Sequence, residues 1–484
     1  MESKEKNLSL LMDFYELTMA NGYMIKGKGD EIGYFDVYFR SAPDNAAFAI
    51  AAGLESAIEY IENFHFSDEE IEFLKGKNLF KDEFLEYLRN FEFKCDIWAI
   101  PEGTVVFPNE PLMTVRGPLI QTQLLETMLL LTLNHQSMIA SKANRVVRAA
   151  DGRVIMEFGS RRAQGPDAAN LGAKAAYIGG VNATANTLAD YHYGVPATGT
   201  MAHSWVQSYD SELEAFEAYA SIYPTNTTLL IDTYDTLKSG VPNAIKCFDN
   251  ILKPMGIRPA GVRLDSGDMA YLSKKTRVML DEAGYEDVKI VSSNSLDEYK
   301  IRDLLLQGAK IDSFGVGEAL ITSRSNPVFG GVYKLVALEK DGEIIPKIKV
   351  SENIEKITTP GFKKVIRIYD SETNKAKADL IMLHDEVLNT EEPLTIFHPL
   401  YTWKKKTLNN YYVKEIQTQI YKEGKLVYKI PTVEESREFC KAEIESLWDE
   451  YKRLEQPQTY KVDLSQKLWD LKYELLNEAK RLEF

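Results

Sequence analysis

The pattern of hydrophobic and polar residues in the first third of the chain differs from the pattern in its middle. GYFDVYFR, residues 33–40, alternates and is rich in aromatic residues, which predicts a strand. Three later segments repeat apolar residues with a helical period, and Ser67 suits the N-cap of the second. They are residues 53–64, 67–76 and 81–91. Residues 95–117 are β-rich with Pro-containing turns, and residues 119–147 predict one long amphipathic helix. The first third is therefore α+β.

In the middle of the chain, short β-rich runs recur, and each is followed by a loop and a helical segment. The runs are residues 153–159, 228–236, 260–268, 288–294 and 310–317. Alternating βα units predict parallel strands, either in an open doubly wound sheet or in a closed barrel. We favour an irregular α/β barrel as the core.

After Gly330 the pattern changes again. GGVYKLVALEKDGEIIPKIKV predicts a hairpin that turns at residues 340–342, and a β-rich stretch follows. Two charged helices close the chain. The first is predicted to begin at Thr432, with Glu435 completing a capping box. Its expected apolar face consists of Phe439, Ile444, Leu447, Trp448 and Tyr451.

These patterns divide the chain into three expected domains. They are an N-terminal α+β domain (1–118), an α/β barrel (119–335) and a smaller C-terminal α+β segment, β-rich with helices (336–484). A length of 484 residues fits this division, because a single core rarely grows so large.

Composition excludes several classes of protein. The formal charge of −15 disfavours a nucleic-acid binder, because phosphate backbones would be repelled. Anionic small molecules remain possible ligands, since backbone N–H groups and a few arginines can hold them locally. No apolar run approaches the length of about eighteen residues that a membrane span needs, and the N-terminus lacks a signal-peptide pattern. The three cysteines lie far apart, which suits a reducing, cytoplasmic location.

Polar residues stand at the end of each middle β-rich run. They are Arg161, Arg162, Asp232, Asp235, Asp265, Asp268, Asn294, Gly315 and Gly317. In parallel architectures the carboxyl ends of the strands meet at one edge, where ligands bind. We therefore expect the site at that edge.

In AGVRLDSGD, Arg263 and Asp265 are two residues apart on a strand, so both side chains point to the same face. They form either a structural ion pair or a cation for an anionic substrate beside a carboxylate. That carboxylate could serve a hydroxyl, a metal ion or a developing positive charge. Asp232 directly follows an apolar run and is predicted at a strand mouth, whereas Asp235 is interpreted as a solvated loop residue.

Three other runs carry candidate chemistry. In EFGSRRAQGPD, Phe158 offers a flat face to an aromatic ring, and Arg161 and Arg162 offer donors to an anion, unless they lie on the surface. FGVGEALI is glycine-rich between strand and helix, which suits a phosphate but is neither a P-loop nor a full GxGxxG. In GTMAHSWV, small residues around His203 leave room for a substrate, although a lone histidine is more often structural.

Together these runs resemble the nicotinate phosphoribosyltransferase family. The resemblance rests on GSRRAQGPDAA (159–169), GTMAHSWV (199–206), LIDTYDT (230–236) and GVRLDSGD (261–268), with DFYELTMANGY (13–23) and GGVYKLV (330–336) in support. It implies an irregular barrel and a homodimer with shared active sites. It also implies formation of nicotinate mononucleotide and diphosphate from nicotinate and 5-phosphoribosyl 1-diphosphate, in NAD biosynthesis. The reaction is coupled to ATP hydrolysis and is classed as a ligase.

The resemblance assigns roles to individual residues. His203 corresponds to the histidine that ATP phosphorylates, and Arg263 to an arginine that contacts substrate. Tyr15 corresponds to a tyrosine that the neighbouring subunit lays over the pyridine ring. Phe158 is expected on the other face of that ring, with Thr200 bordering the nicotinate. The remaining substrate contacts are expected from Arg161, Asn182 and Asn294.

The two aspartates and the glycine-rich loop leave alternatives open. Asp232 and Asp265 are expected to serve ribose hydroxyls, Mg²⁺ or the oxocarbenium-like centre. Asn182 stands where nicotinamide-using relatives carry an aspartate, and a neutral amide suits a carboxylate-bearing substrate. At the expected phosphate loop of Gly315 and Gly317 the family often has threonine where this chain has Glu318. Thr322 is then the alternative hydroxyl donor.

Other functions also fit parts of the pattern. A nicotinamide-specific phosphoribosyltransferase is the nearest alternative, and a non-catalytic nucleotide-binding regulatory barrel is one from another class. The joint presence of Asp232, Asp265 and His203 favours an enzyme, because a sensor does not need that set.

Overall fold

The computed structural model describes residues 7–481, and these residues form two compact units. Of the described residues, the first unit contains 7–138, 328–431 and 438–481, and the second contains 139–327 and 432–437. The expected N-terminal and C-terminal segments therefore belong to the same unit, while the expected division into three domains stays a prediction. The fold of both units is mixed α/β.

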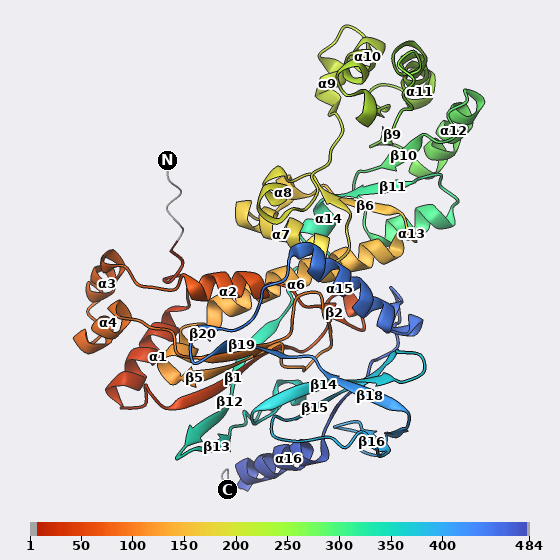
Figure 1. The fold of residues 1–484 in the computed structure, drawn as a ribbon. Helices are drawn as coiled ribbons and strands as arrows, with labels where there is room; N and C mark the ends of the chain where they lie inside the picture. The colour runs from red at the N-terminus through yellow and green to blue at the C-terminus, as the bar shows by residue number, and fades with distance from the viewer. Residues whose placement is uncertain (1–6, 482–484) are drawn as a thin grey trace. The chain divides into compact units, whose positions relative to one another are not determined.

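The first unit is built on mainly antiparallel sheets, in which only the pair of β15 and β21 is parallel among the described strands (Figure 1). Its helices are α1 (Phe14–Ile25), α2 (Leu54–Glu62), α3 (Asp68–Lys75), α4 (Asp82–Arg89), α5 (Leu119–Gln123) and α16 (Gln466–Arg481). Its strands are β1 (Ile32–Phe39), β2 (Ala49–Ile50), β3 (Asp96–Ala99), β4 (Val105–Val106), β5 (Met113–Pro118), β12 (Gly331–Lys340), β13 (Glu343–Pro346), β14 (Lys363–Asp370), β15 (Ala376–Leu383), β16 (Leu394–Phe397), β17 (Lys405–Leu408), β18 (Tyr411–Glu415), β19 (Thr418–Lys422), β20 (Lys425–Leu426) and β21 (Val462–Leu464).

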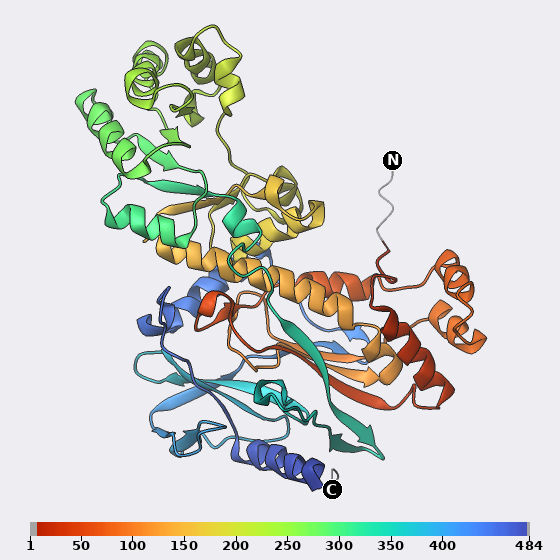
Figure 2. The ribbon, with the colours of Figure 1, turned by 180° about the vertical axis from the view of Figure 1, so that it is seen from behind.

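A seven-stranded sheet in the order β13-β12-β1-β5-β3-β19-β20 joins segments far apart in the sequence. The first strand predicted from the alternating pattern, β1, pairs antiparallel with β12, and the two lie side by side in both views (Figures 1 and 2). A four-stranded sheet, β18-β14-β15-β21, packs a smaller core of its own. The large core of this unit gathers the apolar faces of α2, α3 and α4 with the inner faces of β1, β3 and β5.

Several local predictions for this unit are confirmed. Ser67 caps α3, accepting a hydrogen bond from the backbone N–H of Glu70, and the hairpin of β12 and β13 turns where expected. The single helix predicted over 119–147 is wrong, because the helix breaks at residues 124–125 into α5 and α6 (Glu126–Ala149).

The second unit is a parallel sheet with helices between its strands. Its strands are β6 (Val154–Glu157), β7 (Ala183–Thr184), β8 (Thr228–Leu230), β9 (Gly261–Leu264), β10 (Lys289–Ser292) and β11 (Ser313–Val316). Its helices are α7 (Pro166–Ile178), α8 (Thr187–Tyr193), α9 (His203–Gln207), α10 (Glu212–Ile222), α11 (Val241–Cys247), α12 (Met269–Glu282), α13 (Glu298–Leu306) and α14 (Glu318–Ile321). Helices α9, α10 and α11 lie together at one end of the unit (Figure 1).

All six strands are hydrogen-bonded in the order β7-β6-β11-β10-β9-β8. The five β-rich runs predicted in the middle of the chain each supply one of these strands. Within residues 7–481 the end strands β7 and β8 are not paired with one another, so closure into a barrel is not confirmed. The long segment between β7 and β8 folds as α8, α9 and α10.

The helix α15 (Val433–Ser446) begins as the sequence predicts. Thr432 and Glu435 form the capping box, each bonding the other's backbone N–H. The expected apolar face is wrong, because the helix ends at Ser446, while Phe439 and Trp448 are exposed. The buried positions of the helix are instead Val433, Ser436 and Cys440.

Among the described residues no helix combines the length and the hydrophobicity that crossing a membrane requires. All three cysteines are buried, and none of them forms a disulfide bond within the described chain.

Candidate active site

The strand ends of the second unit bring the sequence-predicted polar residues to one edge. In the parallel register, Arg263 of β9 is paired with Leu230 of β8 and with Val291 of β10. The residues that follow these strands, Asp232, Asp265 and Ser293, therefore emerge at the same edge of the sheet. The site is built by three neighbouring strand ends rather than by one loop.

Arg263 is the centre of this cluster, and its side chain is only 15% exposed. Its Nε donates to Ser293 Oγ at 2.9 Å, Nη1 to Thr200 Oγ1 at 2.9 Å, and Nη2 to Asp265 Oδ1 at 3.0 Å. Its guanidinium carbon lies 5.9 Å from the centre of the Phe158 ring. A single cation thus ties together four segments that are distant in sequence.

The two aspartates adopt complementary roles. Asp232 Oδ2 accepts hydrogen bonds from the backbone N–H of Asp265 at 2.7 Å and from Ser266 Oγ at 2.8 Å. Its other oxygen, Oδ1, is buried and has no hydrogen-bond partner within the described part of the chain. Asp265 Oδ1 accepts from Arg263 and from the hydroxyl of Ser293. Each carboxylate is therefore held by hydrogen bonds to one oxygen, while the second oxygen of Asp265 faces His203 at 3.7 Å.

These free carboxylate oxygens suit a hard cation. Mg²⁺ binds through one or two carboxylates and completes its shell with water and substrate phosphates. Residues 7–481 contain no group of three or more His, Cys, Asp or Glu side chains arranged to hold a metal. Asp232 and Asp265 are the side chains that would hold Mg²⁺ here, together with substrate phosphates.

His203 is the first residue of α9, and its side chain is 39% exposed. Its Nδ1 lies 3.1 Å from Thr233 Oγ1, and its Nε2 lies 3.7 Å from Asp265 Oδ2. Trp205, two residues later, fixes the helix by donating from Nε1 to the carbonyl of Ala215 in α10 at 3.0 Å. The imidazole is therefore positioned beside the carboxylate but remains open to a substrate.

Phe158 follows β6 and is held against β11. Its backbone N–H donates to Val316 O at 2.8 Å, and a Cβ on Gly315 would lie 2.5 Å from its ring. Gly315 is therefore required by the aromatic ring, a packing reason that the sequence alone did not reveal. The buried Glu157 accepts hydrogen bonds from Thr184 Oγ1 and from the backbone N–H of Gly159, which fixes the loop after Phe158.

Several predicted site residues lie outside this cluster. Arg161 is exposed in the short helix after Phe158 and makes no ion pair with a described residue. Asn182 Oδ1 accepts a hydrogen bond from the backbone N–H of Ile155 at 3.0 Å, so this oxygen is bonded to strand β6. Asn294 is exposed and has a positive φ of 87°. Their substrate contacts stay predictions.

At the expected phosphate loop, Gly317 precedes the single turn of α14. The Glu318 carboxylate pairs with Arg324 at 3.2 Å, and Thr322 donates its hydroxyl to the Glu318 carbonyl at 2.7 Å. The carboxylate of Glu318 is thus engaged by a cation, which reduces the repulsion expected from the sequence. Phosphate binding by Gly315, Gly317, Glu318 or Thr322 stays a prediction.

Two further residues have roles of their own. Asp235, interpreted as a solvated loop residue, caps the following helical turn by accepting from the backbone N–H groups of Leu237 and Lys238. Tyr15 lies on α1 of the first unit and is 44% exposed. Burial of part of the ring and the neighbouring Glu126 raise the pKa of its hydroxyl, so it stays protonated near neutral pH.

Sequence reasoning missed three hydroxyls of the cluster: Thr233, Ser266 and Ser293. Each stands next to a residue that was singled out, namely Asp232, Asp265 and Asn294. For Ser293 a signal was available, because it lies two residues after Val291 and so shares that residue's face of the strand. Serine and threonine are too common at strand ends for their type alone to mark a site.

Three family models match the chain. They are the nicotinate phosphoribosyltransferase N-terminal domain over residues 10–134, the nicotinate phosphoribosyltransferase family over 154–370, and the C-terminal domain over 362–472. The chain is 44% identical over 479 residues to a nicotinate phosphoribosyltransferase of Bacillus subtilis, covering 99% of this chain and 97% of the relative.

Solved structures agree. The crystal structure of human nicotinic acid phosphoribosyltransferase superposes with a TM-score of 0.85 at 30% identity, over 96% of this chain and 99% of that one. A nicotinate-nucleotide pyrophosphorylase from Pyrococcus furiosus has the same fold, with a TM-score of 0.70 at 22% identity over 92% of this chain and 97% of that one.

Proposed function

The chain belongs to the nicotinate phosphoribosyltransferase family, and on that premise we propose that it forms nicotinate mononucleotide and diphosphate from nicotinate and 5-phosphoribosyl 1-diphosphate. The reaction is a transferase step of NAD biosynthesis, and we propose that ATP hydrolysis drives it. The observation that carries the proposal is the convergence of Phe158, Thr200, Asp265 and Ser293 on Arg263.

The substrates explain why a cation and two carboxylates are needed at one place. Displacement of diphosphate from C1 of ribose builds positive charge on the sugar ring and negative charge on the leaving group. Asp232 and Asp265 lie where they can stabilise the first charge or hold ribose hydroxyls. A bound Mg²⁺ would neutralise the diphosphate as it leaves. The ring nitrogen of nicotinate is already nucleophilic, so positioning supplies much of the acceleration.

Nicotinate is flat and anionic, and the cluster offers both a flat surface and a cation. The Phe158 ring can stack on the pyridine, while Arg263 has one N–H group beyond those bonded to Thr200, Met201, Ser293 and Asp265. Arg263 is held by these partners before substrate arrives, which lowers the entropy that binding must supply.

The direct test is chromatographic detection of nicotinate mononucleotide from the purified protein, with nicotinate or nicotinamide as the base and with or without ATP. Formation from nicotinate, increased by ATP, supports the proposal. Exclusive use of nicotinamide would show the alternative base specificity, and binding without product would show a non-catalytic protein.

We place the coupling to ATP on His203, which would accept the γ-phosphate. A phosphate on this imidazole would add negative charge beside Asp265, whose Oδ2 lies 3.7 Å from His203 Nε2, and would shift the nearby loops toward a state that binds substrate more tightly. The support is that His203 is exposed enough to be reached and is aligned by Thr233.

Incubation with γ-labelled ATP tests this step. The parent chain is expected to carry an acid-labile label that His203→Ala loses. His192→Ala, which changes an exposed histidine of the same unit, is the matched control and should keep it. Normal labelling of His203→Ala would exclude the assignment.

A homodimer with shared sites is the third part of the proposal. The face of α1 that carries Tyr15 exposes apolar side chains, as an interface would: Phe14, Tyr15 and Met19, with Leu11 exposed just before the helix. Mixing an inactive Tyr15→Ala chain with an inactive Asp265→Asn chain is expected to restore part of the activity. Confirmed subunit exchange without restoration would contradict a shared site.

A further inference from the structure

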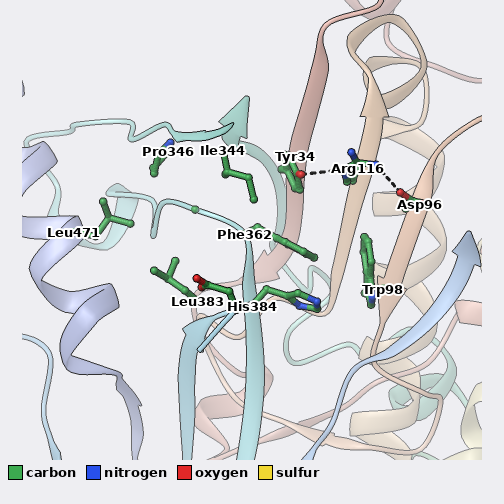
Figure 3. A pocket seen from close by; sticks show the side chains of 12 residues that line it. Tyr34, Asp96, Trp98, Arg116, Ile344, Pro346, Phe362, Leu383, His384 and Leu471 are labelled. Atoms are coloured by element: carbon green, nitrogen blue, oxygen red, sulfur yellow. Dashed lines mark hydrogen bonds and ion pairs between the residues drawn. The ribbon is translucent and has the colours of Figure 1, made fainter. Parts of the chain in front are cut away.

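The first unit contains a pocket of about 450 Å³ that none of the proposed catalytic residues lines (Figure 3). Its walls come from the strands β1, β3, β5, β13 and β15 and from the helix α16. The lining residues that carry the argument are Tyr34, Asp96, Trp98, Arg116, Phe362 and His384. The volume lies in the range of about 300–1,000 Å³ that is typical of small-molecule sites.

One end of the pocket is polar and rigid. Arg116 donates from Nε to Tyr34 Oη at 2.9 Å, from Nη1 to Asp96 at 2.7 Å and from Nη2 to Glu339 at 2.8 Å. Tyr34 and Asp96 are both more than nine-tenths buried. This end is therefore organised before any ligand enters.

The charge of that end disfavours an anion. Arg116 is the cation that lines the pocket, and it is already bonded to the two carboxylates of Asp96 and Glu339. Asp385 adds a further carboxylate to the rim, where its partner Lys467 is largely exposed. Carboxylates outnumber cations here, so N–H donors of a neutral ligand are preferred over a negative group.

The middle of the pocket is aromatic. The rings of Phe362 and His384 stack 4.0 Å apart, and Trp98 lies 4.9 Å from Phe362 and 5.7 Å from His384. Burial lowers the pKa of His384, so its imidazole is neutral near pH 7 and can accept a hydrogen bond.

The opposite end is apolar, formed by Ile344, Pro346, Leu383 and Leu471, as Figure 3 shows. From one end of the pocket to the other, its lining is therefore polar, then aromatic, then apolar. A flat molecule with one hydrogen-bonding edge and one apolar edge matches this order.

We propose that this pocket binds a neutral planar heteroaromatic compound with an N–H-bearing edge. Its ring lies against Trp98 and Phe362, and its N–H groups face Asp96 and His384. Two sources have this chemistry: the base of a nucleoside and a pyridine carboxamide. The site does not depend on the proposed reaction, because its lining shares no residue with the catalytic cluster.

Calorimetric titration of the full chain with adenosine, nicotinamide and nicotinate tests the proposal. Ile344→Trp narrows the pocket at a residue that is 43% exposed, so the fold is expected to persist. Val427→Trp, at a position 55% exposed in the same unit, is the matched control. At least one neutral probe should bind the parent and the control. The same probe should bind Ile344→Trp at least about tenfold more weakly.

The catalytic cluster is unchanged in the parent, the control and Ile344→Trp, so binding there contributes equally to all three titrations. A difference in affinity between these proteins therefore reports on the pocket. Loss of adenosine binding alone would identify a nucleobase site, and loss of nicotinamide binding alone a carboxamide site. Nicotinate binding should be the same in all three proteins. If nicotinate were lost as strongly as the neutral probes, the charge argument would be overturned.

A second pair of variants guards against an indirect effect. Trp98→Leu removes the aromatic wall, whereas Trp403→Leu makes the same change at a side chain that is 72% exposed elsewhere in the unit. Weaker binding in Trp98→Leu but not in Trp403→Leu supports the site. Equal binding in both, or no neutral probe bound at about 1 mM, would overturn it.

Discussion

Two clusters of charged residues, one in each unit, are made of the same residue types and are arranged for opposite purposes. In the first unit, Arg367 is fully buried and bonds Asp379 in a bidentate manner, Glu443 at 2.6 Å and the carbonyl of Val105 at 2.7 Å. In the second unit, Arg263 and Asp265 are 15% and 29% exposed.

The difference lies in which polar atoms are already satisfied. Asp379 accepts both from Arg367 and from the buried hydroxyl of Tyr460, so little of its bonding capacity is left. At the strand ends, Asp232 Oδ1 is free of partners among the described residues. A saturated buried cluster maintains a fold, whereas a cluster with spare atoms and partial exposure is prepared to receive a ligand.

The largest effect should follow from removing Arg367, the cation of the saturated buried cluster in the first unit. Arg367→Met leaves Asp379 and Glu443 without their cation inside the core, and the free energy of unfolding is expected to fall by about 3–5 kcal/mol. Urea unfolding measures it. Arg258→Met removes an ion pair to Asp287 in which both side chains are about half exposed, and should cost less than about 1 kcal/mol. Equal costs would contradict the comparison.

Removing Arg263 from the partly exposed cluster at the strand ends should affect activity rather than stability. Arg263→Ala removes the donors proposed to hold nicotinate, and kcat/KM is expected to fall about 100- to 1,000-fold. Steady-state formation of nicotinate mononucleotide measures the effect, and urea unfolding of the same variant should show little change. Arg263→Lys keeps the charge but loses the fork of donors, so it should recover only part of the activity. A variant that unfolds more readily but retains activity would reverse the assignment.

The pH dependence of stability should report the buried cluster. Burial and the neighbouring Asp379 raise the pKa of Glu110 well above its ordinary value, so the folded state holds a proton that the unfolded state releases. The free energy of unfolding should therefore fall as the pH rises above about 4.5, by at most about 1.4 kcal/mol per pH unit for this one group.

Glu110→Gln removes that titration. Its unfolding free energy, measured in urea across the same pH range, should depend less steeply on pH than that of the parent. An unchanged slope would show that Glu110 is ionised in the folded protein.

The smallest effect separates two adjacent serines. Ser293 is buried and joins Arg263 Nε to Asp265 Oδ1, so Ser293→Ala should lower kcat/KM by about fivefold to tenfold through the loss of one hydrogen bond to a charged group. Ser292 is also buried, but its hydroxyl has no partner in the described chain, so Ser292→Ala should leave kcat/KM unchanged. Ser293→Thr keeps the hydroxyl and should recover activity. Equal kinetics of the two alanine variants would remove the positioning role of Ser293.

Much of the candidate site was available in the sequence. The runs around Phe158, Asp232 and Arg263 predicted strand ends with polar residues, and the run around His203 predicted room for a substrate. The structure brings these four residues together. Asn182 was chosen from the family resemblance and Asn294 from its position at the end of a β-rich run. Both lie outside the cluster, Asn182 with its oxygen bonded to β6. The residue whose side chain points into the site after a strand is set by where that strand ends. Pairing with other strands determines that end.

The sequence by itself determined the local elements and the identity of the chemical groups. Alternation, helical periodicity and the capping box at Ser67 act over a few residues, so no distant contact is needed to specify them. The tertiary structure decided the strand order, the open edge between β7 and β8, the glycine that Phe158 requires, and the hydroxyls that align Arg263 and His203. These features arise from hydrogen bonds and packing between segments tens to hundreds of residues apart, and a local pattern carries no record of which segments will meet.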